Sequence, residues 1–84
     1  MDAKVLKAKK LLLSKFDVDP VAYTFYNNAY LFIAYPKGIK TEERREVMNP
    51  IYLVDLKLNS VGHFSVAFDI NGFFKAAENF KEIK

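Results

Sequence analysis

Residues 21–35, VAYTFYNNAYLFIAY, constrain the fold more than any other part of the chain. Two runs rich in aromatic and β-branched residues flank Asn27-Asn28, and such runs favour β-strands. Asparagine tolerates the positive φ angles that both central positions of a tight type I′ turn require. The pattern therefore predicts an antiparallel hairpin with Asn27-Asn28 as its turn.

Both faces of this predicted hairpin are largely apolar. Pairing across the turn puts Tyr23 opposite Phe32, and side chains alternate between the faces along each strand. One face then carries Val21, Tyr23, Phe25, Tyr30, Phe32 and Ala34. The other face carries Ala22, Thr24, Tyr26, Leu31, Ile33 and Tyr35. Such a hairpin needs cover on both sides, or it exposes an apolar surface.

A helix is predicted over residues 2–16, with Asp2 as its N-cap. Its apolar residues recur at helical spacing, namely Val5, Ala8, Leu12 and Phe16. The run Asp17-Val18-Asp19-Pro20 ends this helix, because the residue before a proline avoids the α region. A second helix is predicted over about 72–82, capped by Asp69 or Asn71.

The middle of the chain predicts a second hairpin. Residues 51–57 and 61–69 alternate as half-buried strands do, and Asn59 suits the left-handed position of the turn between them. The polar stretch 39–50 before them predicts one or two helical turns after Thr41. We therefore expect an α+β fold: an N-terminal helix, a four-stranded antiparallel meander and a C-terminal helix, with both helices on one face of the sheet.

Length and composition restrict the class of protein. Eighty-four residues correspond to a single domain, 1–84, and a hydrophobic content of 51% predicts a folded core. The absence of cysteine excludes disulfides, thiol catalysis and cysteine-based metal sites. No apolar run approaches the roughly 18 residues of a membrane span, and no signal-peptide core is found. We expect a cytoplasmic protein that does not associate with membranes.

No pattern in the chain indicates catalysis. His63 is the only histidine, so a metal site or a nucleophile–base pair would have to include it. Ser65 lies two residues further on the same strand face, which is not the arrangement of a catalytic triad. Asp17 and Asp19 lie in the turn that ends the helix, and the preference of turns for aspartate explains their presence without a catalytic role. We therefore expect no enzymatic activity, no cofactor and no metal.

Residues 52–61, YLVDLKLNSV, resemble a strand–turn–strand phrase of PepSY-type and related immunity-protein domains. In that phrase a tyrosine and a Val-Asp pair precede a glycine and a valine, and here Asn59 stands at the glycine position. The resemblance covers about ten of the 84 residues. It implies a small helix-plus-meander module without catalytic residues, of the kind that inhibits or binds other proteins.

The apolar second face of the sheet is the first candidate for function. If both helices cover the other face, this face exposes a set of large side chains: Tyr26, Leu31, Ile33, Tyr35, Ile51 and Leu53. A contiguous exposed apolar area usually marks an interface, and tyrosine is enriched in binding hot spots. The alternative is that the segment 36–50 folds back over it. Such an interface would serve either self-association or the binding of a different protein. We therefore expect a homodimer, an adaptor or an inhibitor. The small size of the chain also suits a protein encoded by a phage or another mobile element.

The lysines of the N-terminal helix support an alternative function, which is nucleic-acid binding. Residues 1–16 carry five lysines against one aspartate, which leaves −1 for the rest of a chain of net charge +3. Lys4, Lys7 and Lys10 lie on the polar side of this helix, where they are either a solvated face or a contact for nucleic-acid phosphates. Arginine is absent from the helix, so a protein partner is the preferred reading and nucleic acid the alternative.

Overall fold

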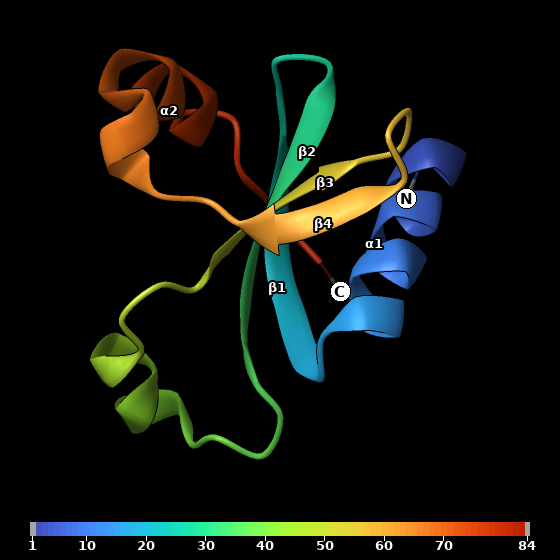
Figure 1. The fold of residues 1–84 in the computed structure, drawn as a ribbon. Coiled ribbons are helices and arrows are strands. Elements are labelled where there is room, and N and C mark those ends of the chain that lie inside the picture. Colours follow the sequence, from blue (N-terminus) through green and yellow to red (C-terminus); the bar gives the residue numbers. More distant parts are fainter. Residues whose placement is uncertain (1, 84) are drawn as a thin grey trace.

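The computed structural model describes residues 2–83. Over this range the chain forms a small α+β domain whose five-stranded sheet is antiparallel throughout (Figure 1). The strands are β1 (Val18–Tyr26), β2 (Ala29–Pro36), β3 (Ile51–Asp55), β4 (Ser60–His63) and β5 (Lys81–Glu82), in the order β4-β3-β2-β1-β5. The helices are α1 (Ala3–Lys15) and α2 (Ile70–Ala77), with the 3-10 turns η1 (Thr41–Glu46) and η2 (Val66–Phe68). The predicted four-stranded meander is present, and β5 is a fifth strand.

The hairpin β1–β2 forms as its sequence predicts. Asn27 and Asn28 have φ angles of 47° and 62°, and Tyr23 pairs with Phe32. Further up the strand the pairing changes, because Pro20 pairs with Ala34 while Ala22 pairs with Ile33. Val21 is thus an extra residue, a β-bulge, which lets β1 tolerate a proline.

The helix α1 packs on one face of the sheet and supplies the main core. Asp2 caps it by accepting a hydrogen bond from the Lys4 backbone N–H at 3.0 Å. Val5, Ala8 and Leu12 are buried against the strands. Their partners on the sheet are Val18, Tyr30, Phe32, Ala34, Tyr52 and Val54.

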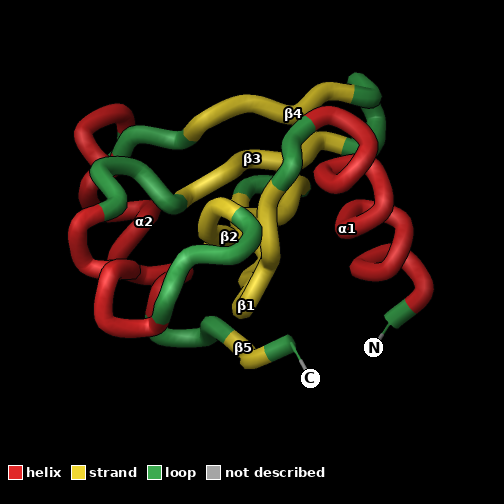
Figure 2. Tube along the Cα trace, turned by 90° about the horizontal axis from the view of Figure 1, so that it is seen from below, coloured by secondary structure: helices red, strands yellow, loops and turns green. Residues whose placement is uncertain are grey.

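The helix α2 lies on the opposite face of the sheet, as both views show (Figures 1 and 2). The Thr24 hydroxyl, which points away from the α1 face, donates a hydrogen bond to the Ala76 carbonyl at 2.9 Å. The expectation that both helices share one face was therefore wrong. The two apolar faces of the hairpin account for this arrangement, because each face gains a cover.

The C-terminal third differs most from the expectation. The predicted strand 61–69 ends at His63, and the Ser65 hydroxyl then accepts a hydrogen bond from the Ala67 N–H to start η2. The predicted helix 72–82 begins at Ile70 and ends at Ala77. The chain then pairs Lys81 and Glu82 with Tyr23 and Ala22 to form β5. Among residues 2–83, neither helix has the length and apolarity to cross a bilayer.

Candidate functional site

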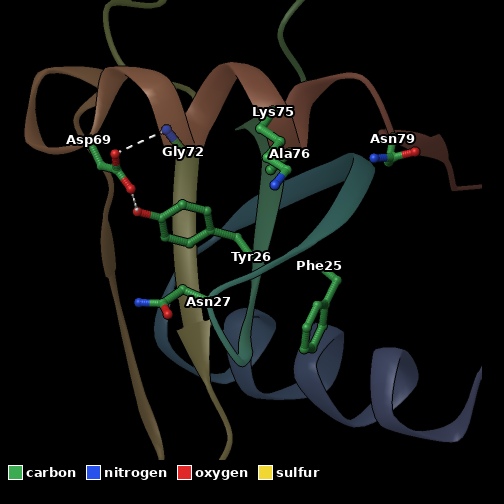
Figure 3. A pocket seen from close by; sticks show the side chains of 8 residues that line it. All are labelled: Phe25, Tyr26, Asn27, Asp69, Gly72, Lys75, Ala76 and Asn79. Carbon is green, nitrogen blue, oxygen red and sulfur yellow. Dashed lines mark hydrogen bonds between the residues drawn. The ribbon is translucent and has the colours of Figure 1, made fainter.

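The tip of the β1–β2 hairpin projects between α1 and α2 and separates two concave surfaces. Phe25 and Tyr26 are neighbours in β1, so their side chains point to opposite sides of the hairpin (Figure 3). Phe25 lies on the α1 side, where 60% of its side-chain surface is exposed. Tyr26 lies on the α2 side. The tip therefore contributes an aromatic ring to each surface.

Asp69 joins α2 to this tip. Its carboxylate accepts a hydrogen bond from the Tyr26 hydroxyl at 2.7 Å and another from the Gly72 backbone N–H at 3.0 Å, so it is also the N-cap of α2 (Figure 3). These two bonds lower the pKa of the Asp69 carboxyl below its ordinary value. The bond to Asp69, with burial and the carboxylate charge, raises the pKa of the Tyr26 phenol. A Cβ atom on Gly72 would meet the Asp69 carboxylate, so this close approach requires glycine.

A hollow of about 460 Å³ lies between the hairpin tip and α2. Its lining contains one carboxylate, one ammonium group and two side-chain amides among apolar residues, which are Phe25, Tyr26, Asn27, Asp69, Gly72, Lys75, Ala76 and Asn79 (Figure 3). The carboxylate is already bonded to Tyr26 and Gly72. This hollow is a poor match for a strongly charged ligand, because its two charged groups have opposite signs and its carboxylate is already hydrogen-bonded.

A second hollow, of about 540 Å³, lies on the α1 side of the tip. We call it the lysine hollow; its lining consists of Lys4, Lys7, Phe25, Asn28, Tyr30, Leu56 and Lys57. The two helix lysines come from the first half of α1, and Lys57 comes from the turn after β3. Lys10, the third predicted lysine, is exposed but does not line the hollow. The Tyr30 phenol has a raised pKa because it is buried, with the Asp2 charge as a further cause.

An aromatic cluster fills the space between α2 and the sheet. The buried Phe64 ring lies 5.2 Å from Tyr26 and 6.0 Å from Phe73, centre to centre. Phe68 and Phe74 extend this cluster outward, at 6.5 Å from Phe64 and 5.9 Å from Phe73 respectively. Phe68 is 79% exposed and Phe74 61% exposed. The cluster is therefore buried on its sheet side and open on its solvent side.

The six residues of the predicted sheet interface all belong to the face that α2 covers in part. Leu31 is fully buried, so it presents no surface to a partner. Tyr26 is bonded to Asp69, and the Arg44 guanidinium lies 4.9 Å from the centre of the Tyr35 ring. The remaining residues are half-buried: Ile33, Ile51 and Leu53. The α2 side thus covers part of this face, and Arg44 of the segment 36–50 contacts it at Tyr35.

The side chains that could take part in catalysis are dispersed. The His63 ring packs on Phe16 and Tyr52, at 5.4 and 4.6 Å between centres, which gives it a packing role. The Asp17 carboxylate forms an exposed ion pair with Lys37 at 3.3 Å. Asp55 accepts the Leu58 N–H and so stabilises the β3–β4 turn. Within residues 2–83, no three histidine, aspartate or glutamate side chains gather as a metal site would need.

Several surface residues were missed by reasoning from the sequence. Lys57 joins Lys4 and Lys7 only because the β3–β4 turn folds beside the start of α1. Phe68 lies within the predicted strand 61–69, and the structure leaves both Phe68 and Phe74 exposed. The doubled Phe73-Phe74 was the available signal, since two adjacent positions of a helix cannot both face the sheet.

Comparison with known proteins found no matching family model, no matching curated protein and no matching solved structure.

Proposed function

We propose that this chain is a non-enzymatic protein-interaction module that binds through the solvent side of the η2–α2 segment. The observation that carries the proposal is a set of large apolar side chains left exposed there. We call it the outer patch; its members are Phe68 (79% exposed), Ile70 (53%) and Phe74 (61%). We prefer it to the sheet face as the interface, because no residue of that face is as exposed as these three.

The members of the outer patch all lie within one short segment, residues 68–74, which distinguishes them from scattered surface residues. Ile70 and Phe74 are four positions apart in α2 and so lie on one face of the helix. Phe68 and Phe74 are connected through the stacked rings of Phe64 and Phe73. Single exposed apolar residues are normal on a protein surface, whereas grouped ones usually mark an interaction site.

The favoured occupant of the outer patch is a second copy of this chain. A two-fold dimer places the same patch on both sides of the interface, so the patch must tolerate its own charge. The charged groups next to it in sequence are Asp69, Lys75 and Glu78, which differ in sign and leave the patch only weakly charged. The lysine hollow on the other side of the tip repels a copy of itself, so it does not suit this role.

Light scattering after size exclusion tests the proposal. The wild-type chain is expected to show a concentration-dependent dimer, and the double variant Ile70→Lys, Phe74→Lys is expected to be monomeric with an unchanged circular dichroism spectrum. Two added like charges facing each other across an apolar interface strongly disfavour association.

The matched control is the double variant Leu13→Lys, Leu58→Lys. It changes two exposed leucines outside the outer patch to lysine, at 39% and 75% exposure, so it adds the same charge. This control should remain dimeric. A wild-type chain that is monomeric at every concentration, or a control that dissociates as the patch variant does, would contradict self-association through the outer patch.

A further inference from the structure

The lysine hollow combines positive charge with an exposed aromatic ring. Lys4, Lys7 and Lys57 line it, and no carboxylate is among its lining residues in the described chain. At its rim Phe25 is 60% exposed, and its ring makes an edge contact with Tyr30 at 5.6 Å between centres. Tyr30 and Leu56 add apolar surface to the lining. A ligand that fits must offer both negative charge and a flat apolar group.

We propose that the lysine hollow binds single-stranded nucleic acid, with a base stacked on Phe25 and the adjacent phosphates at Lys4, Lys7 and Lys57. Nonspecific sites for single strands combine these elements, a positive groove for the backbone and an aromatic ring for a base. The volume of about 540 Å³ lies within the rough range of 300–1,000 Å³ for ligand sites. A duplex does not fit this description, because its bases are already stacked on one another.

One opposing charge near the hollow is the carboxylate of Asp2. It caps α1 by accepting the Lys4 N–H, and its charge contributes to the raised pKa of the Tyr30 phenol, so it lies close to the hollow. Asparagine is an equally good N-cap. The substitution Asp2→Asn therefore removes a charge that opposes phosphate while the helix start is kept.

Fluorescence anisotropy of a labelled oligothymidylate of about eight nucleotides tests the site. The wild-type affinity should fall with salt, with a slope of log K against log salt of about −2 for three lysines. The variant Lys4→Gln, Lys7→Gln should bind more weakly, and its slope should be smaller in magnitude by roughly 1.4. The control Lys9→Gln, Lys10→Gln loses the same charge from the same helix but outside the hollow, and its slope should stay close to wild type.

The substitution Phe25→Leu tests the stacking role. Leucine keeps an apolar side chain but has no ring face, so affinity should drop roughly tenfold with little change in the salt slope. Asp2→Asn should bind more tightly than the wild type. Since neither substitution involves a buried residue, a circular dichroism spectrum equal to wild type is expected for both.

Competitors separate this ligand from others that share its charge. Unlabelled oligothymidylate should displace the probe, whereas inorganic phosphate and oligoglutamate of equal total charge should displace it much less. The proposal is overturned if the wild type does not bind the probe, if the Lys9, Lys10 control loses as much affinity as the Lys4, Lys7 variant, or if Phe25→Leu binds as the wild type does. Full displacement by phosphate or oligoglutamate would also overturn it, in favour of a general anion site or an acidic protein partner.

Discussion

The two faces of the sheet are covered by helices that attach in different ways. On the α1 face, Ala8 and Leu12 of the helix are fully buried against fully buried strand residues such as Phe32 and Val54. On the α2 face, the helix has no buried residue. It is attached by the Thr24–Ala76 hydrogen bond, by the Asp69–Tyr26 hydrogen bond at its N-cap, and by the Phe73 ring, which stacks on Phe64 just after β4. Close packing on the first face provides stability, whereas looser attachment on the second leaves apolar rings available to a partner.

This difference implies that the two helices open at different free energies. Elements with few buried apolar contacts and exposed hydrogen bonds tend to open locally, below the free energy of global unfolding. The amides of α2 should therefore exchange with solvent faster than those of α1 and of the central strand β2. Substitutions on the two faces should therefore differ in the size and the location of their effects.

The largest effect is expected on the α1 face. Leu12→Ala should lower the free energy of unfolding by about 2–5 kcal/mol, because it leaves a cavity among fully buried neighbours. Urea denaturation measures this change. The control Leu13→Ala, one residue further on the exposed side of the same helix, should cost much less. Equal losses for the two variants would show that α1 does not pack as described.

Phe73→Ala is expected to have a smaller effect, of about 1–3 kcal/mol, because the Phe73 side chain is only half-buried. Its loss should appear mainly as faster amide exchange in α2, while β1 and β2 stay protected. Phe74→Ala is the matched control in the next position, where 61% of the side chain is exposed, and it should change stability little. Loss of protection across the whole sheet would contradict the view that α2 opens separately.

Thr24→Val should cost about 1 kcal/mol, since valine keeps the shape of threonine and loses the hydrogen bond to the Ala76 carbonyl. Hydrogen exchange should again place the effect in α2. The substitution is informative because Thr24 belongs to β1, in the centre of the domain, while the expected change is in a helix that follows it by about fifty residues in sequence. A change confined to β1 would contradict it.

The smallest effect is expected for Tyr26→Phe, and it should depend on pH. The folded pKa of Asp69 is lowered, so its contribution is present above the ordinary carboxyl pKa of about 4 and is lost as the pH falls through the folded value. The folded pKa of Tyr26 is raised, so its contribution is present below the ordinary phenol pKa of about 10 and is lost above the folded value.

Urea denaturation across this range measures the difference between wild type and Tyr26→Phe. The difference should be largest between about pH 5 and 9 and should shrink at both ends. Tyr35→Phe removes a phenol that lies on the same face of the sheet and is not bonded to Asp69, so it provides the control. A difference that stays constant from acid to alkaline pH would show that the Asp69–Tyr26 bond does not contribute.

Local signals account for the parts of the fold that were predicted from the sequence. The Asn27-Asn28 turn, the left-handed Asn59 and the cap at Asp2 each depend on a few neighbouring residues, and all three are confirmed. The α+β class and the antiparallel sheet followed from these elements.

Long-range contacts account for the rest. The alternation from Phe64 to Phe68 was read as a strand, but the Ser65 hydroxyl starts a 3-10 turn there. The pairing of Lys81 and Glu82 with β1 could not be predicted from the sequence, because this short charged segment is equally compatible with the end of a helix. The candidate surfaces have the same origin: Lys4 and Lys7 were found from helical spacing, whereas Lys57 joins them only in three dimensions.

The bulge at Val21 also bears on how the length of this chain can vary. In a regular strand, the insertion or deletion of one residue moves all later side chains to the opposite face. Along the β2 edge Val21 is surplus, so a chain without it would pair Pro20 and Ala22 with the same partners in an unbroken ladder. Along the other edge its carbonyl accepts a hydrogen bond from the Ile83 N–H at 2.9 Å. Natural variants of this protein that lack one residue in β1 should therefore lack it here, and the expected cost falls on the attachment of the C-terminal strand rather than on the arrangement of the two faces.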